Sequence, residues 1–153
     1  MQPILGTTTM VQVGIVVHNI DATKAKWAQF LGMSAPETLT LTADPKLTEI
    51  TYKAQPSTHT TCKLAIFHFG NVQMDLIEPD DCPSSWRTFL EEKGEGIHHI
   101  AFGVTDTQDK LDKAAEMGIG VLQRAKFGNL AGEYVYLDSQ AALGCIVETL
   151  ESY

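Results

Sequence analysis

Two halves of this 153-residue chain show the same order of predicted secondary structure, and this internal repeat restricts the possible folds more than any other feature. Each half begins with an apolar strand, continues with a helix, and ends with two or three further strands. The predicted elements lie at 10–17, 21–33, 62–70 and 71–79 in the first half, and at 97–104, 106–118, 120–126, 133–138 and 144–152 in the second. Two copies are too few for a solenoid, and each is too small to bury both faces of its own sheet. We therefore expect two modules that share one core.

The segments between these elements complete the predicted organisation. Asp21 is expected to cap the helix at 21–33. A connector helix at about 83–94 joins the modules, whereas residues 34–60 are polar and show no clear pattern. These features predict an α+β protein, with a single domain over residues 1–153 and modules at about 10–79 and 97–152.

Charge and composition argue against several classes of protein. The formal net charge is −8 and no cluster of Lys and Arg is present, which disfavours binding to nucleic acid or to an anionic membrane. The N-terminal sequence lacks the pattern of a secretory signal, and no apolar run approaches the roughly 20 residues of a membrane span. Three widely spaced cysteines indicate reduced thiols rather than disulfides or a cysteine–zinc site. We expect a soluble, cytoplasmic protein.

Adjacent histidines stand near the start of the second module. Neighbouring side chains on a strand point to opposite faces, so we expect only one of His98 and His99 to face a given site. In both opening strands the bulky residues share one face, which should pack on helices, and small residues share the other face with Gln12 and His99. The pattern predicts that His99 faces a cavity and that His98 lies toward the helix layer.

Superposing the two modules brings four polar residues into correspondence. The opening strands match Gln12 with His99, and the closing strands match Asp75 with Glu148. If a pseudo-two-fold axis relates the modules, all four side chains converge on one point. They could hold a divalent metal or form a polar binding pocket, although Asp75 and Glu148 could also simply face solvent.

The same residues carry a resemblance to the vicinal oxygen chelate superfamily, which includes glyoxalase I, extradiol dioxygenases and methylmalonyl-CoA epimerase. The segment "WRTFLEEKGEGIHHIAFGVTD" (86–106) is similar to the epimerase signature, and "NVQMDLIEP" and "GCIVETLE" resemble its closing strands. The resemblance implies two tandem βαβββ modules that form one cupped, barrel-like mixed sheet with helices outside, and a metal bound inside the cup.

The resemblance also implies roles for individual residues. His99 and Glu148 match two of the family's metal ligands, Gln12 stands where the family usually has histidine, and Asp75 where it usually has glutamine or glutamate. One nitrogen and three oxygen donors favour Mn²⁺ or Mg²⁺ over Zn²⁺, with Co²⁺ as a further candidate. The epimerase also uses a glutamate as a base before the third strand. His59 is the titratable residue in that region here and could act as a general base.

Three functions follow as hypotheses. The favoured one is a metal-dependent isomerase or lyase that acts on a small carbonyl or acyl compound, possibly an acyl-CoA, through an enolate, with Glu148 and His59 as catalytic residues. The alternative is a metal-free protein that binds or sequesters a small molecule. A ring-cleaving dioxygenase needs two histidines and one carboxylate, so Gln12 disfavours it. We further expect a homodimer.

Overall fold

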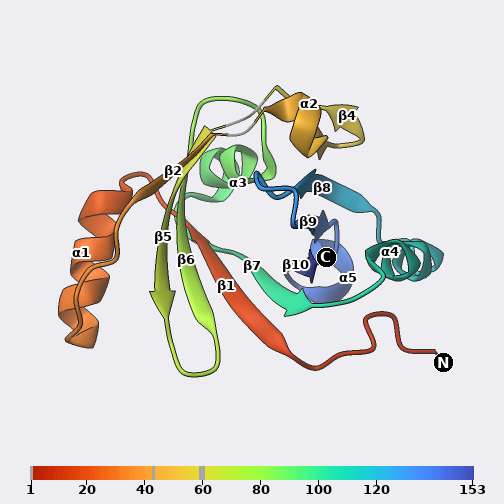
Figure 1. Cartoon of the computed structure of the whole chain (residues 1–153), viewed down its shortest axis with the longest axis horizontal. Coiled ribbons are helices and arrows are strands. Elements are labelled where there is room, and N and C mark those ends of the chain that lie inside the picture. Colours follow the sequence, from red (N-terminus) through yellow and green to blue (C-terminus); the bar gives the residue numbers. More distant parts are fainter. Residues whose placement is uncertain (1, 43, 59–60) are drawn as a thin grey trace.

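Ten strands form one continuous mixed sheet in the computed structural model, which describes residues 2–42, 44–58 and 61–153 (Figure 1). The strands are β1 (Met10–Val16), β2 (Leu39–Thr42), β3 (Thr51–Tyr52), β4 (Gln55–Pro56), β5 (Thr61–His68), β6 (Gln73–Pro79), β7 (Gly96–Gly103), β8 (Val121–Lys126), β9 (Gly132–Leu137) and β10 (Ile146–Ser152). The helices are α1 (Ile20–Leu31), α2 (Pro45–Thr48), α3 (Ser85–Lys93), α4 (Thr107–Glu116) and α5 (Gln140–Leu143). No helix in these ranges is both long and apolar enough to cross a membrane.

The two halves meet along their opening strands. The strand order is β2-β5-β6-β1-β7-β10-β9-β8-β3-β4, and β1 pairs antiparallel with β7. In each half the opening strand runs parallel to the closing strand, β1 beside β6 and β7 beside β10. The duplicated order of elements therefore produces one curled sheet shared by both halves, in an α+β protein, as the repeat predicts.

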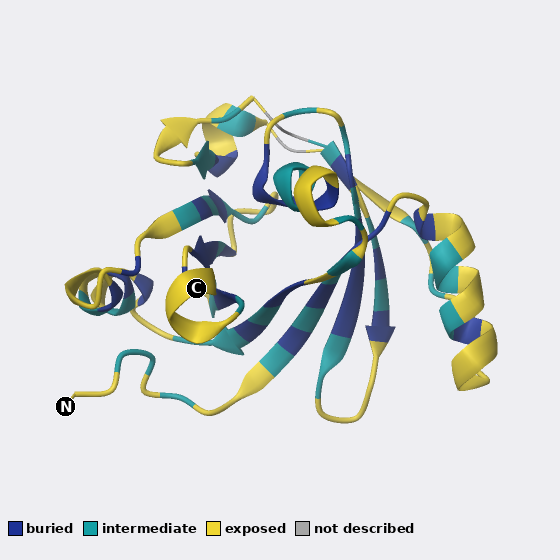
Figure 2. Ribbon diagram, turned by 180° about the vertical axis from the view of Figure 1, so that it is seen from behind, coloured by how far each residue is buried: buried dark blue, intermediate teal, exposed yellow. Residues whose placement is uncertain are grey.

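Apolar side chains on the outer face of the sheet hold one helix over each half. Ala28 of α1 packs with Phe67 and Leu76 of the first half. Leu111 of α4 packs with Val135 and Val147 of the second half. Figure 2 shows the side of α1 that points away from the sheet as exposed and the central strands as largely buried. Burial of these alternating apolar residues fixes which face of each strand is the outer one.

The connector helix α3 lies on the other face of the sheet. Ser84 caps it, as its hydroxyl accepts a hydrogen bond from the backbone N–H of Arg87, and Gly94 ends it. Trp86 and Leu90 then pack into a cluster of inner-face side chains from both halves. While α1 and α4 are outside the cup, α3 closes one end of its interior (Figure 1).

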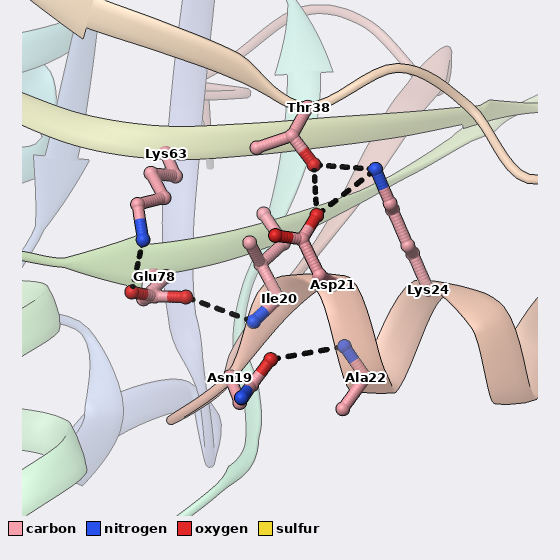
Figure 3. A network of polar contacts seen from close by, with 8 residues as sticks. All are labelled: Asn19, Ile20, Asp21, Ala22, Lys24, Thr38, Lys63 and Glu78. Atoms are coloured by element: carbon pink, nitrogen blue, oxygen red, sulfur yellow. Dashed lines mark hydrogen bonds and ion pairs between the residues drawn. The ribbon is translucent and has the colours of Figure 1, made fainter.

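The start of α1 differs from the prediction by two residues (Figure 3). Asn19, rather than Asp21, is the N-cap, and its side chain accepts from the backbone N–H of Ala22. Asp21 lies in the first turn, where it bonds the Thr38 hydroxyl and pairs with Lys24 at 3.0 Å. The prediction of Asp21 was wrong because Asn and Asp are equally good caps, so residue type cannot choose between them. The extended backbone at Asn19 makes that residue the cap.

A carboxylate from the closing strand reaches the first helix of each half. In the first half Glu78 accepts from the backbone N–H of Ile20 at 2.8 Å and pairs with Lys63 (Figure 3). In the second half Glu151 accepts from the backbone N–H groups of Asp106 and Thr107 at 2.8 and 2.9 Å. Both carboxylates satisfy backbone donors that a helix start leaves without partners.

The polar stretch without a clear pattern forms β2, α2, β3 and β4, none of which the sequence predicts. β2 pairs with β5 at one edge of the sheet, whereas β3 pairs with β8 at the far end of the second half. We call residues 39–42 and 44–56 the crossing segment, because β2 lies at one end of the curled sheet and β3 and β4 lie at the other. An ion pair of 2.7 Å between Glu49 and Lys126 also joins it to β8.

Candidate functional site

The four predicted site residues lie in a row across the four central strands. Asp75 is on β6, Gln12 on β1, His99 on β7 and Glu148 on β10. All four are buried, with 0–7% of their surface exposed. Their strand positions place them on the inner face, opposite the helices α1 and α4.

Three of the four side chains meet directly. Nε2 of Gln12 lies 3.3 Å from Nε2 of His99, and the same imidazole nitrogen lies 3.1 Å from Oε2 of Glu148. The second contact does not have hydrogen-bond geometry, so Oε2 of Glu148 is buried without a hydrogen-bond partner. A buried carboxylate oxygen in this state is available to a cation or a bound ligand.

Asp75 joins the row through Gln73, a residue that the sequence argument missed. The side-chain amide of Gln73 donates to Oδ1 of Asp75 at 3.0 Å and reaches Oε1 of Gln12 at 3.5 Å. Gln73 is two residues before Asp75 and therefore on the same face, so strand alternation could have found it. Burial and the negative charge of Glu148 raise the pKa of Asp75 to about 7.

The two adjacent histidines do not face opposite sides of the sheet, contrary to the prediction. His99 pairs with Gly14 but Ile97 pairs with Ile15, so His98 is an extra residue in a β-bulge. As a result the Nδ1 atoms of His98 and His99 are 2.9 Å apart. His98 does contact a helix, through Phe89 of α3, but this helix is inside the cup.

Burial and the neighbouring His99 lower the pKa of His98 to about 3, so His98 is neutral near pH 7. One of the two Nδ1 atoms must then donate to the other. When His99 is the donor, its Nε2 keeps a lone pair toward Gln12 and Glu148. The bulge therefore gives His99 a partner that can set its tautomer.

Gly14 makes room for the His99 ring. A Cβ atom at this position would lie 2.0 Å from Cε1 of the imidazole, which is far inside van der Waals contact. The sequence predicted that the small residue in β1 leaves open space beside His99, but the imidazole ring itself fills this space. Gly14 is the surface on which the ring lies.

Aromatic side chains surround the polar row. Tyr136, the cross-strand neighbour of Glu148, contacts both histidine rings and accepts a hydrogen bond from Nε1 of Trp86 at 3.0 Å. Burial raises the pKa of Tyr136 well above its ordinary value, and the charge of Glu148 adds to this effect. The phenol stays protonated and can donate its own hydrogen.

A cavity of about 670 Å³ opens above the row. Gln12, Asp75 and Glu148 lie at its floor, whereas His99 is fully buried behind them. The crossing segment supplies part of the wall, including Thr48 and Ile50. The volume is that of a typical site for a small organic ligand.

The donor set fits a divalent cation that prefers oxygen. Two carboxylates, one amide and one imidazole can coordinate such an ion, and the unpartnered Oε2 of Glu148 faces the imidazole that would share it. Nevertheless, no three His, Cys, Asp or Glu side chains among the described residues form a ready metal-binding group. Asp75 bonds Gln73 through Oδ1, so coordination by all four residues would use its second carboxylate oxygen. His59, the predicted base, lies outside the described residues.

Comparisons with known proteins agree with this architecture. The sequence model of the Glyoxalase/Bleomycin resistance protein/Dioxygenase superfamily matches residues 11–136. The uncharacterized protein YqjC of Bacillus subtilis is 30% identical over 89 residues, a match that spans 58% of this chain and 64% of YqjC.

Solved structures with the same fold cover almost the whole chain. Methylmalonyl-CoA epimerase from Mycobacterium tuberculosis superposes with a TM-score of 0.68 at 18% identity, covering 100% of this chain and 93% of the epimerase. The hypothetical protein BH1468 from Bacillus halodurans superposes with a TM-score of 0.66 at 22% identity, covering 94% of each chain. At these identities the structures show the fold, and the sequence model shows the family. This chain is a member of the Glyoxalase/Bleomycin resistance protein/Dioxygenase superfamily.

Proposed function

We propose that the protein is a metal-dependent isomerase or lyase that acts on a small carbonyl or acyl compound. The observation that carries this proposal is the row of Gln12, Asp75, His99 and Glu148, buried on four adjacent strands beneath a cavity. In this proposal the four side chains hold a divalent cation. That the protein is a homodimer and lies in the cytoplasm stays a prediction.

The cation would supply Lewis-acid stabilisation of the negative charge that develops on a substrate oxygen when a proton leaves the neighbouring carbon. The chain's own residues supply position and surroundings. Tyr136 and Trp86, which bond each other, place aromatic rings along the cavity that would limit access of water, and His98 holds the ring of His99. Glu148 borders the cavity and is placed to contact the substrate. His59 remains the predicted proton acceptor.

Metal content and proton exchange test this proposal together. We expect protein purified without chelator to retain close to one divalent ion per chain, and to exchange a substrate α-proton for deuterium. Replacing His99 or Glu148 with alanine removes one of four donors and is expected to lower both metal content and exchange. His59→Ala is expected to keep the metal and lower the exchange rate by about 10²–10⁴-fold.

A second candidate function, a metal-free binding protein, is favoured by the hydrogen bonds of the first-half residues. Gln73 already bonds both Asp75 and Gln12, so these two side chains have polar partners without an ion. Protein that takes up no metal from a Mn²⁺, Co²⁺ or Zn²⁺ solution and exchanges no α-proton, yet binds a carbonyl ligand, would support this second function against the first.

A further inference from the structure

The walls of the cavity are apolar over most of their area. Leu64, Ile66 and Ile77 come from the first half, Tyr134 and Leu150 come from the second, and Phe127 lies beyond β8. The carboxylates that line the cavity are both at the floor, where the metal ligands of the proposed function lie, and the polar lining residues away from the floor are mainly threonines. A ligand that fills this cavity thus has one polar end and a body without charge.

Positive charge is scarce around this space. Of the described residues that line the cavity, Lys126 alone is cationic, and its Nζ pairs with Glu49 at 2.7 Å. The nearby Arg124 is not part of the lining, and it forms two hydrogen bonds with Glu133 at 2.6 and 3.0 Å. Both cations already have a carboxylate partner, which a carboxylate or a phosphate of a ligand would have to replace.

The floor adds negative charge. Asp75 and Glu148 both border the cavity, and a divalent cation held between them would bring the charge of these three groups only to zero. An anionic ligand would therefore lose its hydration in a largely apolar space without gaining a net positive charge around it, and this disfavours its binding relative to a neutral ligand. The formal net charge of −8 on the whole chain opposes the approach of an anion as well.

We propose that the cavity selects an uncharged, largely apolar carbonyl compound and discriminates against carboxylates and acyl-CoA esters. This proposal rests on the proposed function, of which it specifies the substrate class. The carbonyl oxygen lies toward the floor, and the apolar body lies against the walls. Among the described residues that line the cavity, the phosphate groups of an acyl-CoA would find no cation other than Lys126, which is already paired with Glu49.

A matched pair of probes tests the charge preference directly. 4-Phenyl-2-butanone and 3-phenylpropionate have nearly the same shape, but the first is neutral and the second is an anion. We expect calorimetric titration of the purified protein, with and without added Mn²⁺, to show at least about tenfold tighter binding of the ketone. Tighter binding of the carboxylate or of propionyl-CoA overturns the proposal, as does failure of the ketone and of 3-phenylpropionamide to bind.

A charge-insertion variant sharpens this test. Leu41 lines the cavity on the edge strand β2 and is 46% exposed, so lysine can replace it without entering the core. Leu41→Lys is expected to improve carboxylate binding by about fivefold or more and to leave ketone binding nearly unchanged. Leu39→Lys is the matched control, because Leu39 is on the same strand and 44% exposed but outside the lining. An equal gain in both variants contradicts the assignment of this cavity.

The charge preference and the proposed reaction can fail separately. Ketone binding without α-proton exchange removes the isomerase or lyase and keeps the charge preference. Exchange with an acyl-CoA or a carboxylate, but not with a neutral ketone, keeps the isomerase or lyase and removes the charge preference.

Discussion

The two halves of the sheet have similar outer faces and different inner faces. On the outer face, Glu78 and Glu151 occupy corresponding positions of the closing strands, and each binds the start of its own first helix. On the inner face, the first half supplies an amide and an aspartate, whereas the second supplies an imidazole and a glutamate. The shared outer contacts build each module, and the differing inner residues make the site asymmetric.

Because of this asymmetry, the two halves contribute different groups to the site. The close contact of His99 with Glu148 lies entirely in the second half, whereas Asp75 in the first half is held by Gln73. Gly14 in the first half accommodates the His99 ring of the second. The first half thus mainly shapes the site, and the second supplies its nitrogen donor and its unpartnered carboxylate oxygen.

The largest expected effect comes from filling the space under His99. Gly14→Ala places a Cβ 2.0 Å from the imidazole, so the ring or β1 must move. We expect a loss of about 3 kcal/mol in the free energy of unfolding, measured in urea, since overpacking of a buried site costs this much. Gly103→Ala on the paired strand is the control, because its Cβ would meet Val11 at an ordinary 3.6 Å. Similar losses in the two variants would show that the ring of His99 does not need Gly14.

The next effect concerns the amide that replaces the usual imidazole in the first half. Gln12→His gives the two halves the same donor, and we expect Zn²⁺ affinity to rise by about 10–100-fold, because imidazole binds Zn²⁺ better than an amide oxygen does. Competition with a fluorescent chelator measures the affinity. The double variant Gln12→His/His99→Ala should lose the gain. A gain that survives in the double variant would place the ion elsewhere.

The smallest expected effect compares the two helix contacts on the outer face. Glu151→Ala leaves two backbone N–H groups without their acceptor at α4, where no side-chain cap bond exists, and should cost about 2 kcal/mol of unfolding free energy. Glu78→Ala should cost about 1 kcal/mol, because Asn19 still caps α1. Equal costs would mean that the Asn19 cap contributes nothing to this difference.

The same pair predicts a pH dependence. Contacts with the Thr107 side chain and with the backbone N–H groups of Thr107 and Asp106 lower the pKa of Glu151 below its ordinary value of 4.5. Because the pKa is lowered in the folded state, the ionised carboxylate stabilises the fold at pH values above 4.5. This stabilisation is lost as the pH falls from 4.5 through the lowered pKa of the folded state. Urea unfolding from pH 7 to pH 3 should therefore show a steeper loss for the wild type than for Glu151→Ala.

Local signals explain which elements the sequence could predict. The connector helix α3 begins after Ser84 and ends at Gly94, and both residues act through bonds within the helix itself. The opening strands were found because their apolar residues alternate. By contrast, β3 and β4 have two residues each, and β3 exists because it pairs with β8, about 70 residues away in the chain. No local pattern of residues along the sequence predicts such a long-range pairing.

The candidate site was predictable to the extent that it depends on the repeat. Matching the halves predicted that Gln12, Asp75, His99 and Glu148 converge on one point. In the structure three of them meet directly, and Asp75 is linked to the row through Gln73. The β-bulge at His98 and the bond between Gln73 and Asp75 could not be read in the same way. Both depend on the register between strands and on side-chain rotamers, and tertiary packing decides these.

Within the crossing segment β2 corresponds to β8, since each pairs antiparallel with the next strand of its own half, but residues 44–56 have no counterpart in the second half. Thr48 and Ile50 of this unduplicated part line the cavity, but neither belongs to the row at the floor. Substitutions in this part of the chain can therefore change which ligands enter the cavity and leave the polar row at its floor unchanged. In evolutionary terms, we infer that the duplicated core keeps the polar row and that the unduplicated segment is where a lineage can acquire a new ligand.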